Sequence, residues 1–226
     1  MFKYAKRLVI GQDGKEDTMS VIVDESESAV NCLMTLYMLK RSNNRIDGIT
    51  KMQKLMFSAQ NEMTRNSIYA ISGEFYRWDH GPMSNEVYRT NNILVENGLV
   101  EDRALALTNQ GETFLDDFIY IIDNNKKVFG IIDKCVEEFS YLSLREIKEK
   151  IYSMMVVPLG CVAPKPIRDL PHGTTILRNK GFESLVDIDA DDIETLEIYL
   201  NEEMHQSILA GMDDAKSGRI SGLEIA

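Results

Sequence analysis

Apolar residues recur at helical spacing along most of the chain. The clearest stripe occupies positions i, i+3, i+4, i+7 and i+11 of a segment that starts near residue 50: Met52, Leu55, Met56, Ala59 and Met63. Asp47 and Thr50 each offer a side-chain oxygen that can cap the start of this helix. The opposite face is predicted to be solvated, with a recognition face as the alternative; its polar residues are Lys51, Gln53, Lys54 and Gln60.

The same spacing predicts further helices at about 25–41, 84–97, 108–122, 126–140 and 143–156. Asp24 or Ser26 is expected to cap the first of these, and Gly98 to end the second. Ser143 and Glu146 have the spacing of a capping box. The chain is therefore predicted to be mainly helical.

Short β-leaning runs interrupt the helices. A polar turn separates two of them within 3–24, and an aromatic run over 69–78 leads to the turn at Gly81 and Pro82. Residues 99–107 are predicted to form a hairpin or wing. The expected fold is mainly α with small β elements: a compact helical domain with a winged-helix-like helix-strand-helix-wing-helix core.

The positions of prolines, glycines and acidic residues along the chain predict four parts. An N-terminal β-hairpin (1–24) precedes the helical domain (25–156), and a connector (157–181) contains four of the five prolines. Residues 182–226 are predicted to form an acidic amphipathic helix, capped by Asp189 or Asp191, and a flexible tail. The apolar stripe of that helix consists of five residues: Ile193, Leu196, Leu200, Met204 and Ile208.

The net charge of −11 is concentrated in one segment. Residues 1–181 hold 23 basic and 24 acidic side chains, whereas residues 182–217 hold 1 and 11. This distribution makes nucleic-acid binding unlikely and favours a basic partner. No run of 18 apolar residues is present, and the three cysteines are expected to be reduced and buried, so we predict a cytoplasmic protein with no membrane association.

Candidate catalytic chemistry is sparse. Lys54, Glu74 and His80 would form an acid-base cluster if the helix and the turn met. The favoured interpretation is that His80 orients the turn and that Trp78 fills the core. We therefore expect no catalytic residue, no metal site and no cofactor, since neither zinc-ligand nor phosphate-loop spacing occurs.

Two segments resemble the Panacea domain of SocA-like antitoxins, which are often described as phage-associated proteins. The first is the helix 51–59, read as KMQKLMFSA, and the second is the turn and helix start 78–88, read as WDHGPMSNEVY. Departures from the family pattern include Met52, Met56, Phe57 and Met83, which keep the hydrophobic character. The matching scaffold positions are Lys51, Lys54, Leu55, Trp78, Gly81, Pro82, Val87 and Tyr88.

The resemblance implies a prokaryotic toxin-antitoxin protein that neutralises a cognate, basic protein toxin by direct binding, and it implies no catalytic residues. Residues 211–220 also resemble the endings of several small antitoxins, so Arg219 joins the five stripe residues as a candidate partner contact. A homodimer is compatible with the same surface. The alternative is a winged-helix regulator that contacts duplex DNA through Arg89 and Arg103.

Overall fold

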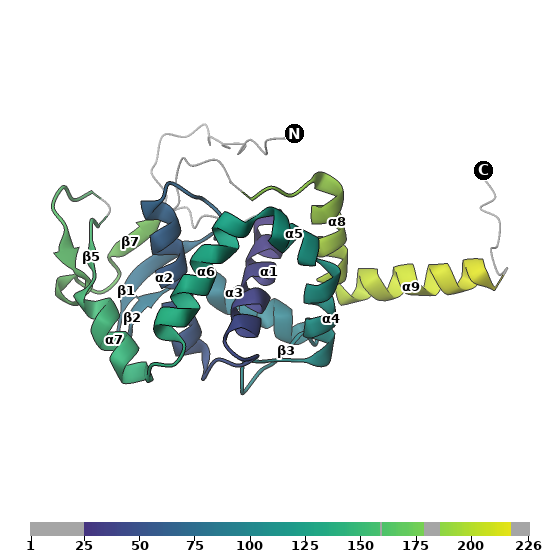
Figure 1. Ribbon diagram of the computed structural model, residues 1–226, viewed down its shortest axis with the longest axis horizontal. Helices are drawn as coiled ribbons and strands as arrows, with labels where there is room; N and C mark the ends of the chain where they lie inside the picture. Colours follow the sequence, from purple (N-terminus) through teal and green to yellow (C-terminus); the bar gives the residue numbers. More distant parts are fainter. Residues whose placement is uncertain (1–24, 159, 179–185, 218–226) are drawn as a thin grey trace, which may run out of the picture.

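The computed structural model describes residues 25–158, 160–178 and 186–217, which form a mainly helical body with a few small antiparallel sheets (Figure 1). This confirms the predicted class. The expected hairpin at 3–24 and the end of the chain from residue 218, including Arg219, lie outside the described residues.

Two helices, α1 (Glu25–Arg41) and α2 (Ile49–Arg65), form the centre of the body. Helices α3, α6 and α7 and strand β2 all pack against α2. The predicted caps of α2 are wrong: its N-cap is Gly48, which has a φ of 85° and no side chain, and Asp47 pairs with Arg45 at 3.3 Å. A positive φ is easily adopted by glycine, so the chain turns into α2 without a side-chain cap.

A three-stranded antiparallel sheet lies against the side of α2, in the order β2 (Gly81–Met83), β1 (Glu74–Trp78) and β7 (Thr175–Arg178). Strand β1 is shorter than the predicted 69–78 run. Strand β7 falls inside the segment predicted as an irregular connector, which is therefore partly regular. Ile176 and Leu177 of β7 are buried, and a four-residue strand is too short to show a periodic pattern.

A helix, a strand pair and a further helix come next along the chain. Helix α3 (Asn85–Glu96) is capped by the Ser84 hydroxyl, and the antiparallel pair β3 (Val100–Glu101) and β4 (Ala106–Leu107) leads to α4 (Asn109–Asp117). A Cβ on Gly111 of α4 would lie 2.3 Å from the carbonyl oxygen of Leu99. Only glycine allows α4 to approach the chain before β3 this closely.

The predicted helix 108–122 is divided at Phe118 into α4 and α5 (Ile119–Asn124). Helices α6 (Lys126–Phe139) and α7 (Leu144–Ser153) agree with the prediction, and the capping box of Ser143 and Glu146 is confirmed. A small ribbon of β5 (Met155–Val156) and β6 (Lys165–Pro166) and a 3-10 turn, η1 (Ile167–Asp169), follow α7. Together they place η1 beside α7.

The predicted single C-terminal helix is two helices. Helix α8 (Ala190–Tyr199) packs on α1, whereas α9 (Glu202–Lys216) projects away from the body (Figure 1). The break falls at Leu200 and Asn201, where the Asn201 side chain caps α9 by accepting from the Met204 amide at 3.1 Å. Residues 211–216, predicted as part of a flexible tail, belong to α9.

One hydrophobic core joins these elements. Its largest fully buried side chains include Phe57, Phe75 and Phe129, and the rings of Phe57 and Phe75 meet edge to face at 5.4 Å between centroids. Cys32 and Cys135 are buried free thiols, as expected, but Cys161 is exposed. Burial raises the pKa of Cys135 to about 12, so this thiol stays protonated.

Candidate functional site

The polar face of α2 is buried, which contradicts its predicted exposure. Each of its four polar side chains donates a hydrogen bond to the backbone carbonyl of a loop that is distant in sequence. Lys51 donates to Ser140, and Gln60 donates to Gly73 at 3.0 Å. Burial of polar groups is tolerated when they are hydrogen-bonded, so this face acts as an anchor for loops rather than as a solvated surface.

The middle of the same face holds the start of α3 and the turn before it. Gln53 accepts from the amide of Ser84 at 2.8 Å and donates to its carbonyl at 2.9 Å, and Lys54 donates to the carbonyl of Pro82 at 2.7 Å. The two segments that carry the family resemblance are therefore in direct contact. The hydrogen bonds of Gln53 and Lys54 explain in structural terms why polar residues stand at these positions of α2.

Gly81 occupies the closest point of this contact. It has a φ of 95°, and a Cβ there would lie 3.3 Å from Cε of Lys54 and 3.8 Å from Cζ of Tyr152. Tyr152 is held in place because its hydroxyl donates to the carbonyl of Asp79 at 2.9 Å. A larger residue at 81 would be strained and would press on both side chains.

Lys54 is a buried amine with no carboxylate beside it among the described residues. Its side chain is 2% exposed, and its pKa is lowered to about 7, first by burial and then by the positive charges of Lys148 and Arg77. The local potential is therefore positive, although the chain as a whole is acidic.

The acid-base cluster considered for Lys54, Glu74 and His80 is not assembled. Glu74 interacts with Arg178 and with the Tyr76 hydroxyl, whereas Lys54 bonds to Pro82 and His80 is exposed in the turn. These are different partners on different sides of β1. The convergence that this catalytic alternative requires is absent among the described residues.

The remaining scaffold positions divide into two groups. Leu55 and Val87 are buried in the core, as a packing role requires. Trp78 and Tyr88 are 46% and 42% exposed, so the prediction that Trp78 fills the core is wrong. Strand β1 ends at Trp78, and the ring lies over the surface with its centroid 6.0 Å from that of His172.

Helix α8 is fixed to the body at both ends by asparagine side chains. Before the helix, Asn125 donates to the carbonyl of Asp187 at 2.8 Å and accepts from its amide at 2.6 Å. After it, Asn97 donates to the carbonyl of Leu200 at 2.9 Å. Ile193 and Leu196 are buried between these two attachments, so these predicted partner contacts pack within the chain.

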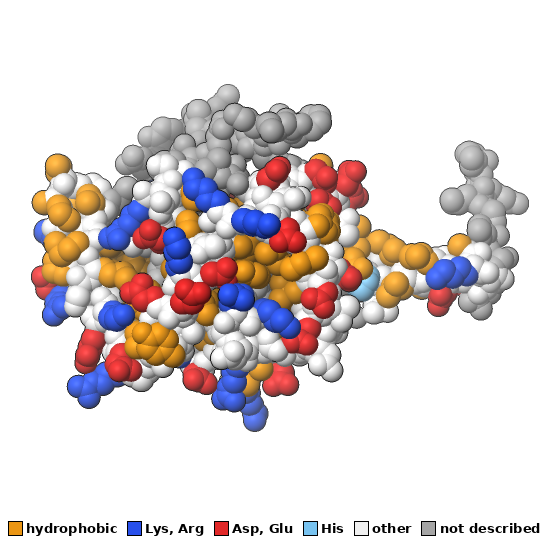
Figure 2. Space-filling model, viewed as in Figure 1, with side chains coloured by type: hydrophobic (Ala, Val, Ile, Leu, Met, Phe, Trp, Pro, Cys, Tyr) orange, Lys and Arg blue, Asp and Glu red, His pale blue; other side chains and the backbone are white. Residues whose placement is uncertain are grey.

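Helix α9 presents the rest of the predicted stripe to solvent. Its exposed apolar side chains are Met204 (48%), Ile208 (40%), Leu209 (44%) and Met212 (50%). Figure 2 shows hydrophobic side chains along this helix and acidic side chains gathered near α8. Met204, Ile208 and Met212 follow one another at intervals of four, which places them on one face. Leu209 and Met212 were not among the residues singled out in the sequence.

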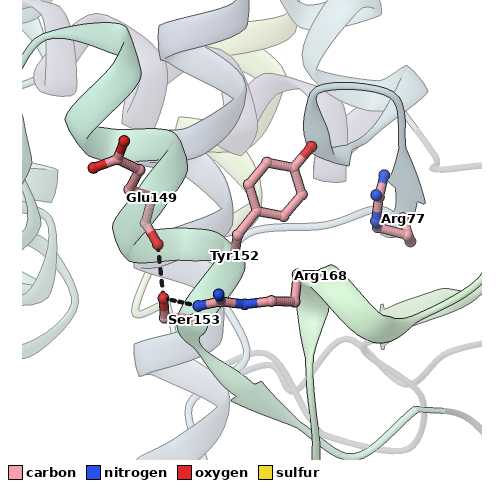
Figure 3. Close-up of a pocket in the computed structure, with 5 residues that line it drawn as sticks. All are labelled: Arg77, Glu149, Tyr152, Ser153 and Arg168. Atoms are coloured by element: carbon pink, nitrogen blue, oxygen red, sulfur yellow. Dashed lines mark hydrogen bonds between the residues drawn. The ribbon is translucent and has the colours of Figure 1, made fainter.

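A cavity of about 340 Å³ lies between β1, α7 and η1. It is lined by Arg77, Glu149, Tyr152, Ser153 and Arg168 (Figure 3). The Arg77 guanidinium carbon lies 5.1 Å from the centre of the Tyr152 ring, and Arg168 donates to the Ser153 hydroxyl. No sequence pattern indicated this cavity, because its residues come from three separate elements.

Comparison with family models, with curated proteins and with solved structures found no match. Within the described ranges, no group of three or more histidine, cysteine or acidic side chains is arranged to hold a metal ion. None of the described helices combines the length and the apolar character needed to cross a bilayer.

Proposed function

We propose that this protein is an antitoxin-like protein that neutralises a cognate toxin by direct binding, with α9 as the principal contact. The observation that carries the proposal is the exposed apolar stripe of α9, defined here as Met204, Ile208, Leu209 and Met212. The preceding helix is attached to the body at both ends, whereas α9 projects from it (Figure 1).

The stripe has the size and spacing of a helix that binds in a groove. Amphipathic helices place residues at i, i+4 and i+7 or i+8 into apolar grooves of their partners. Full burial of one large apolar side chain contributes about 1.5 to 3 kcal/mol, so four such residues supply a large part of the free energy of a specific complex. The proposed partner therefore offers an apolar groove.

The charge of the region supports a basic partner. Residues 182–217 hold 1 basic and 11 acidic side chains. Glu203, Asp213 and Asp214 lie exposed on α9 itself. A basic rim around the groove would speed association and select the partner. A second copy of the chain would bring two acidic helices together, and an anionic lipid surface would repel them, so both are less favourable occupants.

The resemblance to the Panacea domain supports the same proposal. Its two segments meet through Lys54 and Pro82 and through Gln53 and Ser84, which makes them part of one scaffold. In that family the scaffold is shared and the partner differs among members. A projecting helix outside the scaffold is consistent with a partner-specific element.

The test is co-expression of the full chain with the product of the neighbouring gene, with growth as the readout. The variant Met204→Ala/Ile208→Ala/Met212→Ala truncates three of the four stripe residues and keeps helix propensity, and it is expected to abolish rescue. Gln206→Ala/Ser207→Ala, on the same helix, is the matched control and is expected to rescue fully. Unchanged rescue by the triple variant would contradict the role of α9. If the product of the neighbouring gene is toxic and neither the wild type nor the control variant restores growth, the antitoxin assignment is contradicted.

A second candidate is DNA binding by a winged-helix-like core. The supporting observation is that α3 is followed directly by the antiparallel pair β3 and β4, with Arg103 exposed between the strands. Against it, Glu96, Glu101 and Asp102 are exposed around the same surface. A mobility-shift series in increasing salt, with Arg103→Ala as the variant, tests this function.

A further inference from the structure

The cavity between β1, α7 and η1 is lined by two arginines that form no ion pair within the part of the chain that the structure describes. The other described arginines form ion pairs, except Arg103. Arg77 and Arg168 have no ion pair among the described residues, and both line this one cavity. In a chain with 36 acidic and 25 basic side chains, two guanidinium groups that line one cavity without such a pair indicate a site for an external anion.

The hydrogen-bonding capacity of Arg77 is only partly used. Its Nη1 donates to the carbonyl of Trp78, but its Nε is buried and has no acceptor among the described residues. The guanidinium is held against the ring of Tyr152, which is itself fixed by its bond to Asp79. A buried donor without an acceptor is unfavourable, so an anion that reached it would remove this cost.

On the opposite side of Tyr152, the Arg168 guanidinium is directed toward Ser153 (Figure 3). The Ser153 hydroxyl donates in turn to the carbonyl of Glu149 at 2.9 Å. The Glu149 carboxylate accepts from Arg145 at 3.1 Å and is directed away from Tyr152 and Arg168 (Figure 3). Lys54 and Lys148 add positive charge on the side of α7 and β1. The cavity is therefore a positive site.

We propose that this cavity binds a small phosphate monoester, with Arg77 and Arg168 contacting the phosphate. Phosphate carries more charge than carboxylate and has three terminal oxygens, which suits two planar guanidinium forks. The volume of about 340 Å³ is at the lower end of small-molecule sites. A nucleic acid is the less favoured ligand, because it requires a longer run of cations than these two arginines.

The test is a fluorescence titration of the full-length chain with glycerol 3-phosphate. The readout is the emission of the single tryptophan, Trp78, which follows Arg77 in β1. Its backbone carbonyl accepts from the Arg77 guanidinium, so a ligand that moves this guanidinium is expected to change the emission. A saturable change is expected with glycerol 3-phosphate, and none with glycerol or with sodium chloride at equal ionic strength. Arg168→Ala is expected to weaken binding by about tenfold, which corresponds to the loss of a charge-assisted contact. Arg168→Lys is expected to weaken it less, because the charge is kept while the fork is lost.

The matched control is Arg103→Ala, which removes an arginine that also forms no ion pair within the described ranges but lies in a turn outside the cavity. It is expected to bind as the wild type does. No saturable response, or equal affinity in wild type and Arg168→Ala, would overturn the proposal. Tighter, Arg168-dependent binding of a single-stranded oligonucleotide would overturn the choice of a small ligand. These measurements use the isolated protein, so their outcome does not depend on the proposed toxin.

Discussion

The side-chain nitrogen of Lys54 lies 2.7 Å from the carbonyl oxygen of Pro82, and no carboxylate of the described ranges accompanies it there. This contact joins the central helix to the turn before α3. It requires the glycine at position 81, because a side chain there would occupy the path of Lys54. The buried amine also makes stability depend on pH.

The free energy of unfolding is expected to rise with pH through a contribution of Lys54. Its pKa is about 7 in the folded chain, below the ordinary value of 10.5. Between these values the unfolded chain holds the extra proton, so raising the pH favours the folded state. The unfavourable contribution is complete below about pH 7. The free energy of unfolding of the wild type, relative to that of Lys54→Met, should therefore rise by up to about 1.4 kcal/mol per pH unit between pH 7 and 9.

Urea denaturation of both proteins at intervals from pH 6 to 9 measures this difference. The slope with pH is the readout, because Lys54→Met also leaves the Pro82 carbonyl without its donor. Lys127→Met, at an exposed site on α6, controls for the loss of one positive charge. If the free energies of unfolding of the wild type and of Lys54→Met differ by the same amount at every pH, Lys54 keeps its proton in the folded chain.

Two glycines in helices are expected to respond oppositely to substitution by alanine. In Gly111→Ala the new Cβ would lie 2.3 Å from the Leu99 carbonyl oxygen, so the backbone must shift and stability should fall by about 1 to 3 kcal/mol. Gly130, inside α6, has no atom within 4 Å of such a Cβ, and Gly130→Ala should raise stability by about 0.5 to 1 kcal/mol. Thermal or urea unfolding measures both. A neutral Gly111→Ala would mean that α4 and Leu99 are not in close contact.

Local patterns predicted the helices well and the tertiary relationships poorly. Ser143 and Glu146 mark the start of α7 correctly, because a capping box is formed by residues three apart. The burial of Gln53 and Lys54 was missed because their acceptors, Ser84 and Pro82, are distant in sequence. The break between α8 and α9 had a local signal in Asn201, a good capping residue, which the continuous apolar stripe obscured.

The cavity between β1, α7 and η1 had no local sequence pattern of this kind. Arg77, Tyr152 and Arg168 are each ordinary in their own segment, and β7 and η1 were assigned to an irregular connector. Only the pairing of β7 with β1, together with the packing of η1 on α7, brings them to one place. A helical or strand period describes one element at a time, so it cannot show such a convergence.

Substitutions in the two C-terminal helices are expected to separate stability from partner binding. Leu196 of α8 is fully buried, so Leu196→Ala should lower the free energy of unfolding by about 2 to 5 kcal/mol. Ile208 of α9 is exposed, so Ile208→Ala should change it by less than about 0.5 kcal/mol. Urea denaturation of the isolated chain measures both. A large loss for Ile208→Ala would show that α9 packs on the body, which would contradict its availability to a partner.

Hydrogen exchange is expected to distinguish the two helices directly. The amides of α8 should exchange slowly, because Asn125 holds Asp187 before the helix and Asn97 holds Leu200 after it, whereas those of α9 should exchange within the fast phase. Asn125→Ala removes two of these hydrogen bonds, so α8 should exchange faster while α2 is unchanged. Asn124→Ala, at the neighbouring exposed position, is the control. Slow exchange in α9 of the isolated chain would contradict an unoccupied stripe. Protection of α9 that appears only on adding the toxin would locate the contact on this helix.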